Sequence, residues 1–315
     1  MSLILIDWLS PAPHAEFNQN LYKVLRNSSV VYVYSEKLVD LDGECVVQRR
    51  PKTRLFHALS VLKICWKHRK DQIFFITYDD LFVWIAQFFV KTILCFEHKT
   101  TPNHPFWDKH AVWQRVLFYR LERLCQSKAQ LSMLAKMGQR CHWLGLPIPN
   151  VTIVDKTSVE NSFLFVSEQI SIPVVQSIVG HCYGKIKLKK SVSNTQNIIP
   201  GHGVAVEFVS RFNLPEDLMS AEALVLSIDS SVRGSGWYTE AIKFGVPLVI
   251  VAPGQQYVFE STYPNYPYVK GDLVEDADDL KNKIALVRRF DGSKYADSYM
   301  GLLQNRVASL LSIGE

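Results

Sequence analysis

Short runs of β-branched and aromatic residues alternate with longer amphipathic segments through the first half of the chain. The short runs predict buried strands, because strands covered on both faces of a parallel sheet are apolar at consecutive positions. The longer segments repeat apolar residues at the spacing of an α-helix. The predicted strands are 3–6, 30–34, 72–77, 92–96 and 129–132, and the predicted helices are 14–26, 55–69, 79–90 and 108–125. This alternation predicts an α/β domain with a parallel sheet.

A second series of the same kind follows the segment 142–158, in which two prolines and a loss of helical periodicity predict a linker. Its predicted strands are 162–167, 204–208, 223–227 and 247–251, and its predicted helices are 173–179, 215–220, 236–244 and 277–290. The sequence therefore predicts two Rossmann-like domains, 1–155 and 156–292, that face each other across a ligand-binding cleft. The helical segment 293–315 could cross back onto the first domain.

Three features of the sequence bear on the compartment of the protein. The most apolar stretch, 81–96, contains Lys91 and is shorter than the roughly 20 apolar residues of a spanning helix, so we predict a buried helix and strand there. The opening MSLILIDWLSPAP has no basic residue before its short apolar run, which favours a first strand over an export signal. The six cysteines form no CxxC pair, which predicts reduced thiols in a cytoplasmic protein.

Positive charge is concentrated in the first quarter of the chain. The composition, 48% hydrophobic and 21% charged, is that of an ordinary globular protein, and the formal net charge is +5. The segments RRPKTR (49–54) and WKHRK (66–70) are basic, whereas 216–279 is rich in acidic residues. This asymmetry could attract an anionic lipid or acceptor, or it is an ordinary solvated face. No nucleic-acid-binding motif accompanies it, so we expect no nucleic acid as a partner.

A glycine-rich turn precedes a short predicted helix in SSVRGSGWYTEAIKFGVPLVIVAPG (230–254). The first N–H groups of a helix lack internal partners, and the helix dipole favours an anion beside them. Gly234, Ser235 and Gly236 leave these N–H groups uncovered, so they could hold a diphosphate. Glu240 lies one turn further, where it could accept hydrogen bonds from the hydroxyls of a ribose. The alternative is that the glycines serve a close-packed turn from strand to helix.

From residue 204 onward the sequence resembles the second domain of GT-B-fold glycosyltransferases, particularly the family-4-like enzymes that use nucleotide-diphosphate sugars. VEFVSRFNLPEDLMSAEALVLSIDSS is similar to the segment that leads to their donor loop, and GSGWYTEAIKFGVPLVI is similar to the loop and its glutamate. The resemblance implies donor binding by Arg233, Gly234, Ser235, Gly236, Trp237, Tyr238, Glu240 and Lys187. The family often has a second glutamate eight positions earlier, where Val232 stands here, so the sugar and the stereochemical outcome stay open.

The first half contains the candidate catalytic residues. TILCFEHKTTPN ends a predicted strand with Glu97 and His98, where enzymes of this family often place a histidine that faces the reacting sugar. The resemblance implies that His98 hydrogen-bonds a sugar hydroxyl. Glu97 or Asp7 could be the general base that removes a proton from the acceptor hydroxyl. The alternative for all three is an ordinary hydrogen-bonded residue at a strand end.

Other polar clusters admit two interpretations. Lysines alternate in GKIKLKK (184–190), which predicts a strand that is either a solvated edge or a source of positive charge for the departing diphosphate, with Lys187 as the candidate. His202 lies between two glycines, in a tight turn or beside the donor. The aromatic segment 104–120 is either an amphipathic helix or a contact with a lipid-linked acceptor. The histidines form no metal-binding pattern, and we predict no metal.

These observations together predict a glycosyltransferase that needs neither metal nor cofactor. It would move a sugar from a nucleotide-diphosphate sugar, bound by 156–292, to a polysaccharide or lipid-linked saccharide on the 1–155 side, in cell-envelope biosynthesis. We expect a cytoplasmic protein that associates peripherally with the inner face of the membrane. The alternatives are a sugar-nucleotide epimerase, a nucleotide-monophosphate-sugar transferase of the same fold, and a non-catalytic transferase-like scaffold. A nicotinamide dehydrogenase is disfavoured, because no GxGxxG follows the first strand.

Overall fold

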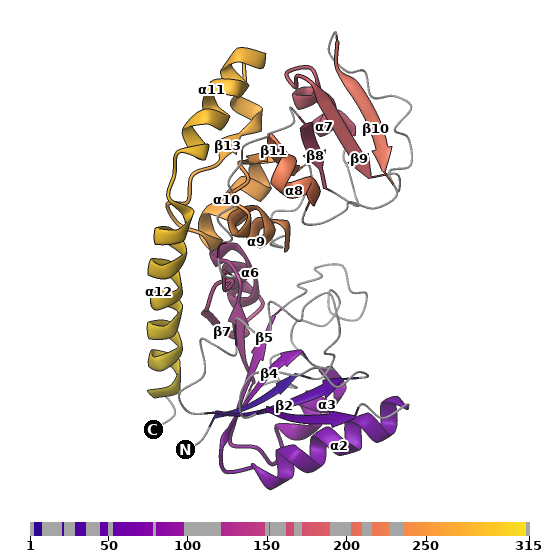
Figure 1. Ribbon diagram of the computed structural model, residues 1–315. Coiled ribbons are helices and arrows are strands. Elements are labelled where there is room, and N and C mark those ends of the chain that lie inside the picture. The colour runs from indigo at the N-terminus through magenta and orange to yellow at the C-terminus, as the bar shows by residue number, and fades with distance from the viewer. Residues whose placement is uncertain are drawn as a thin grey trace. The chain divides into compact units, whose positions relative to one another are not determined.

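The chain forms two compact units, Met1–Pro147 with Met300–Glu315 (unit 1) and Ile148–Tyr299 (unit 2). Each unit is built around one parallel sheet, as Figure 1 shows. The two units divide within the predicted linker, slightly before the predicted boundary at residue 155. The computed structural model describes residues 3–7, 21, 29–35, 45–49, 53–77, 80–97, 121–148, 151, 162–166, 172–189, 203–209, 216–226 and 236–312.

The described part of unit 1 contains a seven-stranded parallel sheet in the order β3-β2-β1-β4-β5-β6-β7. Its strands are β1 (Leu3–Asp7), β2 (Ser29–Ser35), β3 (Cys45–Arg49), β4 (Gln72–Thr77), β5 (Thr92–Phe96), β6 (Leu121–Cys125) and β7 (Arg140–Trp143). Its helices are α2 (Arg54–Lys67), α3 (Asp80–Ala86) and α6 (Lys128–Lys136). Ile4, Ile73 and Ile93 of the sheet share a buried core with Val61 of α2 and Val83 of α3.

Two predicted elements of unit 1 are wrong. The last five residues of the predicted helix 108–125 form β6, and the predicted strand 129–132 lies inside α6. Both charged residues of β6 have partners from other segments of unit 1. Nε2 of His142 lies 3.1 Å from a carboxylate oxygen of Glu122, and Arg123 donates to a carboxylate beside β5. Strands β3 and β7 are short and were not predicted.

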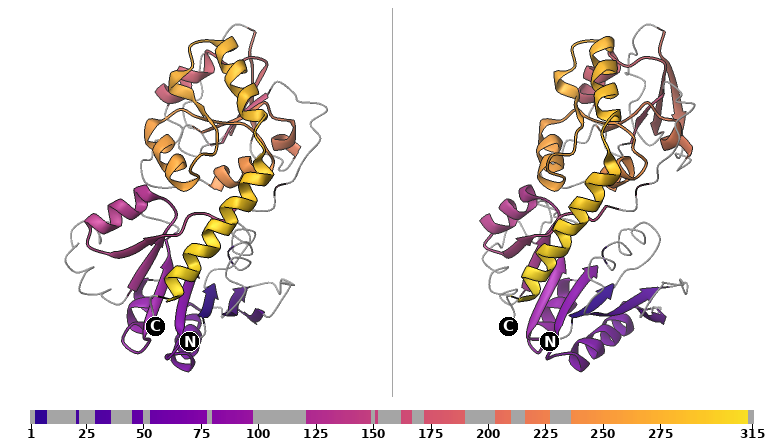
Figure 2. Two further views of the ribbon diagram at one scale, coloured as in Figure 1. Left: turned by 90° about the vertical axis from the view of Figure 1, so that its left-hand side faces the viewer. Right: turned by 60° about the vertical axis from the view of Figure 1, so that its left-hand side comes forward.

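The described part of unit 2 contains a six-stranded parallel sheet in the order β10-β9-β8-β11-β12-β13. Its strands are β8 (Ser162–Phe165), β9 (Lys185–Lys189), β10 (Ala205–Val209), β11 (Ala223–Leu226), β12 (Leu248–Ile250) and β13 (Val269–Lys270). Its helices are α7 (Ile172–Val179), α8 (Glu216–Ser220), α9 (Gly236–Lys243), α10 (Pro253–Thr262), α11 (Ala277–Arg288) and the 3-10 helix η2 (Gly271–Leu273). Figure 2 shows helices on both sides of this sheet. The two parallel sheets with interleaved helices confirm the predicted α/β class.

Strand β9 and helix α10 differ from the sequence-based prediction. β9 is not the solvated edge that its lysines suggested, because it lies between β10 and β8. α10 was not predicted. Proline is well suited to the first position of a helix, where its missing N–H leaves no bond unmade, and α10 begins at Pro253.

Helix α12 (Gly292–Ser312), the long yellow helix in Figure 2, contributes its residues up to Tyr299 to unit 2 and those from Met300 to unit 1. Within unit 1, Trp143 of β7 lies between two cations. The Arg306 guanidinium of α12 lies 3.5 Å from the centre of the Trp143 ring, and the Lys128 ammonium lies 4.7 Å from it. Arg306 also donates a hydrogen bond of 3.0 Å to the carbonyl oxygen of Leu144.

We expect Arg306→Ala to lower the free energy of unfolding by about 2 kcal/mol. The change removes a hydrogen bond from a charged group together with a cation–π contact, which are worth roughly 1.5–3 and 0.5–2 kcal/mol and do not add fully. Urea unfolding followed by tryptophan fluorescence measures the loss. Arg289→Ala, at the exposed end of α11, is the control and should change the midpoint little. Equal midpoints for both variants would contradict this role of Arg306.

The stretch 81–96, predicted as a buried helix and strand, contains α3 and β5. None of the helices in the described ranges has the length and apolar character needed to cross a bilayer. The cysteines whose side chains are described, at positions 65, 95, 125, 141 and 182, are free thiols. Burial raises the pKa of the Cys65 thiol to about 12, so this group stays protonated at neutral pH.

Candidate functional site

The start of helix α9 in unit 2 is open. Gly236 is its first residue and is exposed. A Cβ atom added at Gly236 would meet no heavy atom within 4 Å in the part of the chain that the structure describes. Within the described ranges, no residue packs against this position. The first N–H groups of α9 have no partner within the helix, and they carry its positive end.

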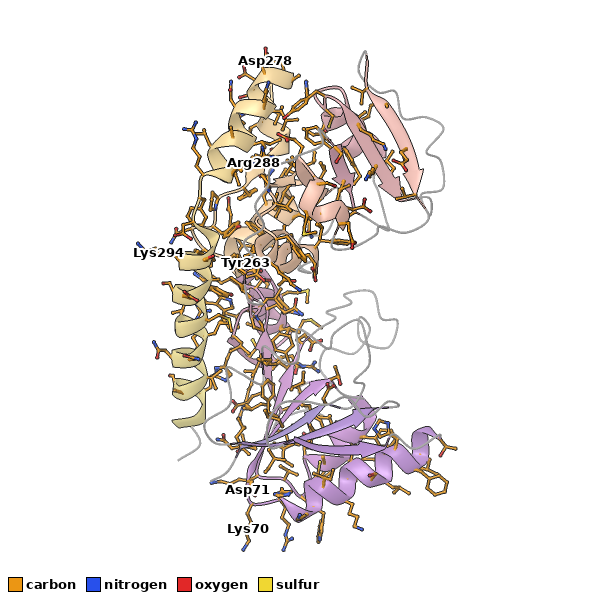
Figure 3. All side chains as sticks on the ribbon, viewed as in Figure 1. Lys70, Asp71, Tyr263, Asp278, Arg288 and Lys294 are labelled. Atoms are coloured by element: carbon orange, nitrogen blue, oxygen red, sulfur yellow. The ribbon has the colours of Figure 1, made fainter. Side chains whose placement is uncertain are left out.

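Tyr238 fixes the first turn of α9 from inside unit 2. Its side chain is completely buried, and its hydroxyl donates hydrogen bonds to the carbonyl oxygen of Gln255, at 3.3 Å, and to the side-chain oxygen of the same residue. Its ring meets that of Phe259 edge to face, with centroids 4.9 Å apart, and Tyr263 continues the cluster (Figure 3). Burial raises the pKa of the Tyr238 hydroxyl, which therefore remains a donor. Tyr238 thus supports the helix from behind and does not line an open surface.

Trp237 and Glu240 lie on the more exposed side of α9, and both side chains are half-buried. Ala241 and Ile242 of the same helix are buried, so one face of α9 packs against the unit while the other carries these polar and aromatic groups. Thr239 donates a hydrogen bond of 2.6 Å to the carbonyl oxygen of Gly236, which closes the first turn. Glu240 therefore lies about one helical turn, or roughly 5.4 Å along the axis, from the open start.

Lys187 lies on β9 and forms an ion pair inside unit 2. Its ammonium group lies 2.8 Å from a carboxylate oxygen of Asp217 on α8, and the two side chains are 12% and 15% exposed. Lys185, two residues earlier on the same strand, lies 2.5 Å from a carboxylate oxygen of Glu207 on β10, in a pair that is 44% exposed on each side. The positive charge of Lys187 is thus partly balanced within the unit, and two of its three N–H donors are available to other acceptors.

Asp7 and Glu97 end neighbouring parts of the sheet in unit 1. Asp7 closes β1, is completely buried, and accepts a hydrogen bond of 2.6 Å from the hydroxyl of Thr77 at the end of β4. Glu97 follows β5, and its carboxylate pairs with the Arg123 guanidinium, each side chain being 8% exposed. The carboxyl ends of parallel strands meet at one edge of the sheet, so the structure brings Asp7 and Glu97 to the same edge.

The backbone at Glu97 is held by two glutamine side chains. Gln126 and Gln130 donate hydrogen bonds of 2.9 and 3.0 Å to the carbonyl oxygen of Glu97. Gln130 also accepts a hydrogen bond of 2.7 Å from the amide of Gln126, so the two side chains form one network. The network therefore holds the backbone at the end of β5. The sequence analysis missed this network. The only local sign of it was Ser127, which caps the start of α6, the helix that carries Gln130.

No protein-family model and no curated protein matches this sequence. Solved structures do match over the whole chain. HepE from Anabaena, in complex with UDP and glucose, aligns with a TM-score of 0.65 at 14% identity, covering 99% of this chain and 100% of that one. A glycosyltransferase from Rickettsia africae aligns at 0.56 and 12% identity, covering 98% and 93%. A UDP-N-acetylglucosamine 2-epimerase from Rickettsia bellii aligns at 0.50 and 10% identity, covering 100% and 97%.

The chain has a GT-B fold. This confirms the resemblance that the sequence carried from residue 204 onward and extends it over both units. Transferases and an epimerase are both similar to this chain, so the GT-B fold by itself does not choose between these activities.

Some of the predicted site residues lie within the described ranges, and others lie outside them. Asp7, Glu97, Lys187, Gly236, Trp237, Tyr238 and Glu240 are placed as given above. Arg233, Gly234, Ser235 and His98 lie outside the described residues, as do Val232 and His202. Among the described residues, no group of three or more His, Cys, Asp and Glu side chains could hold a metal ion. The roles assigned to all these residues stay predictions.

Proposed function

We propose that the protein is a glycosyltransferase that moves a sugar from a nucleotide-diphosphate sugar to a saccharide or lipid-linked saccharide acceptor. The observation that carries this proposal is the open, rigidly anchored start of α9, with Glu240 one turn away, in a chain with a GT-B fold. A helix start of this kind binds anions through its free N–H groups and its dipole. A diphosphate has the charge and the size to use both.

The donor would lie with its diphosphate against Gly236 and the preceding residues Gly234 and Ser235. Glu240 would accept hydrogen bonds from the two ribose hydroxyls, since a carboxylate offers two acceptor oxygens. The half-buried Trp237 would border the donor, while the fully buried Tyr238 would act only by holding the helix in place. HepE was solved with UDP and with UDP-glucose, which supports a uridine nucleotide as the first donor to test.

In the proposed reaction, the bond between the anomeric carbon and the diphosphate oxygen breaks, and a bond to the acceptor oxygen forms. The departing diphosphate gains charge, which the positive end of α9 and Arg233 would stabilise without a metal ion. Lys187, already paired with Asp217, would contribute less positive charge than an unpaired lysine. The acceptor hydroxyl loses a proton to Glu97 or Asp7, and His98 would orient a sugar hydroxyl.

Calorimetric titration with UDP, GDP, TDP and ADP tests this proposal. We expect one nucleotide to bind with micromolar affinity, equally with and without EDTA, and Gly236→Ala to weaken it about tenfold because the new methyl group covers the helix start. Gly301→Ala is the matched control, since an added Cβ there also meets no heavy atom of the described residues. If none of the four binds, the donor site is wrong and a non-catalytic scaffold is favoured.

A sugar-nucleotide epimerase is the second candidate, because such an enzyme from Rickettsia bellii is similar in fold over the whole chain. Incubation with UDP-sugars in the absence of any acceptor distinguishes the two activities. An epimerase converts the donor under these conditions. A transferase releases UDP at a significant rate only when a saccharide acceptor is added, so a new sugar nucleotide without acceptor would favour the epimerase.

A further inference from the structure

Helix α2 of unit 1 carries a second apolar row beside the face that enters the core. The inner face places Ala58, Val61, Ile64 and Cys65 in the buried core. The outer face carries large apolar side chains in solvent, with exposed fractions of 62% at Leu55, 64% at Phe56, 52% at Leu59 and 57% at Trp66. Leu55, Leu59 and Trp66, with the partly buried Leu62, are spaced by four, three and four residues, so they form one row along the helix. We call this the outer row of α2.

Basic residues predominate beside the outer row, and the carboxylate of Asp71, directly after them, lies 3.2 Å from Nδ1 of His68. Lys63, Lys67, Arg69 and Lys70 are exposed on α2 and the turn that follows it, where Figure 3 labels Lys70. The segment RLFHALSVLKICWKHRK (54–70) contains no Asp or Glu. An apolar row with mainly lysine and arginine beside it is the pattern of a helix that lies in the interface of a membrane.

The turn that follows α3 extends the apolar surface. Trp66 contacts Phe89, with ring centroids 5.5 Å apart, and Phe88 beside it is 59% exposed. The Arg69 guanidinium lies 5.0 Å from the centre of the Trp66 ring and donates to the Trp66 carbonyl oxygen at 3.2 Å. Tryptophan with a nearby cation is well suited to the boundary between lipid tails and headgroups, since its ring is apolar and its N–H is polar.

We infer that the outer row of α2 docks on an anionic lipid bilayer, with the apolar side chains inserted and the lysines on the headgroups. A second copy of the chain is a poor occupant, because it would bring like charges of the same face together. A helix of 14 residues is about 21 Å long and would lie flat on the surface. The inference does not depend on the proposed function, although it would bring a transferase to a lipid-linked acceptor.

Sedimentation of the full chain with phospholipid vesicles tests the inference. We expect binding to vesicles of phosphatidylcholine with one-third phosphatidylglycerol, reduced by salt, and weak binding to phosphatidylcholine alone. The variant Lys63→Gln, Lys67→Gln, Lys70→Gln should bind about fivefold more weakly per lysine removed. The variant Leu55→Ser, Leu59→Ser, Trp66→Ser should lose binding at every lipid composition. Both variants change exposed side chains, so the fold should persist.

Matched controls lie in unit 2, where Leu286→Ser removes a leucine that is 66% exposed and Lys281→Gln removes an exposed charge of α11. Both should bind vesicles as the parent chain does. Failure of the parent chain to bind anionic vesicles overturns the inference, as does equal loss in the controls, and the face would then fit an acidic protein partner better. No nucleotide is present in this assay, so its outcome is separate from the test of the donor site.

Discussion

Glu240→Ala is expected to weaken binding of the nucleotide diphosphate about 10- to 100-fold while leaving the fold intact. The carboxylate is the proposed acceptor for two ribose hydroxyls, and hydrogen bonds to a charged group contribute roughly 1.5–3 kcal/mol. Each 1.4 kcal/mol corresponds to about tenfold in affinity. The side chain is half-buried on the more exposed face of α9, so its removal leaves the buried Ala241 and Ile242 in place.

Calorimetric titration of the variant with the nucleotide that binds the parent chain measures this effect. Glu240→Gln should weaken binding less than the alanine variant, because it keeps one acceptor oxygen of the same reach. Glu275→Ala, an exposed glutamate between η2 and α11, is the matched control and should leave the affinity unchanged. Unchanged affinity in Glu240→Ala would remove this residue from the donor site.

Arg123→Leu is expected to lower the free energy of unfolding by about 3–5 kcal/mol. Glu97 would then keep a carboxylate that is 8% exposed without its guanidinium partner, and removal of one member of a buried ion pair has this cost. The same loss is not expected for the exposed pair of Lys185 and Glu207, since such pairs contribute about 0–1 kcal/mol. Lys185→Leu is therefore the control.

The double variant Arg123→Leu, Glu97→Gln separates the ion pair from the rest of the site. Because the second change removes the uncompensated charge, the double variant should be more stable than Arg123→Leu alone. Urea unfolding followed by circular dichroism measures all four proteins of the cycle. Additive losses would show that the pair contributes little. Sugar transfer by Glu97→Gln, measured on folded protein, then tests its proposed role as general base independently of stability.

The fold was largely predictable where local pattern and tertiary environment agree. Strands β1, β4 and β5 are apolar at nearly every position, because a parallel sheet buries both faces. Helices α2 and α11 lie close to their predicted positions, and each has a side-chain N-cap, Thr53 and Asp276 respectively. In these segments the local sequence pattern fits only one type of secondary structure.

The segment 121–136 was mispredicted because its polar residues have distant partners. LERLC carries two charges among three apolar residues, which fits a helix face, yet Glu122 and Arg123 pair across strands. Gln130 likewise gains its partners from the end of β5. A local sequence pattern contains no information on such contacts, which override intrinsic propensity.

By itself the sequence determined two α/β domains, a glycine-led helix start in the second and a glutamate one turn later, because apolar periodicity and helix-start chemistry are local properties of the chain. Only the tertiary structure decided that Gly236 is exposed, that Tyr238 is buried, and that Asp217 pairs with Lys187. It also decided that the outer row of α2 is exposed. The physical reason is that burial and ion pairing depend on which distant segments fold against a residue. The periodicity of the residue's own segment is the same whether or not another segment covers it.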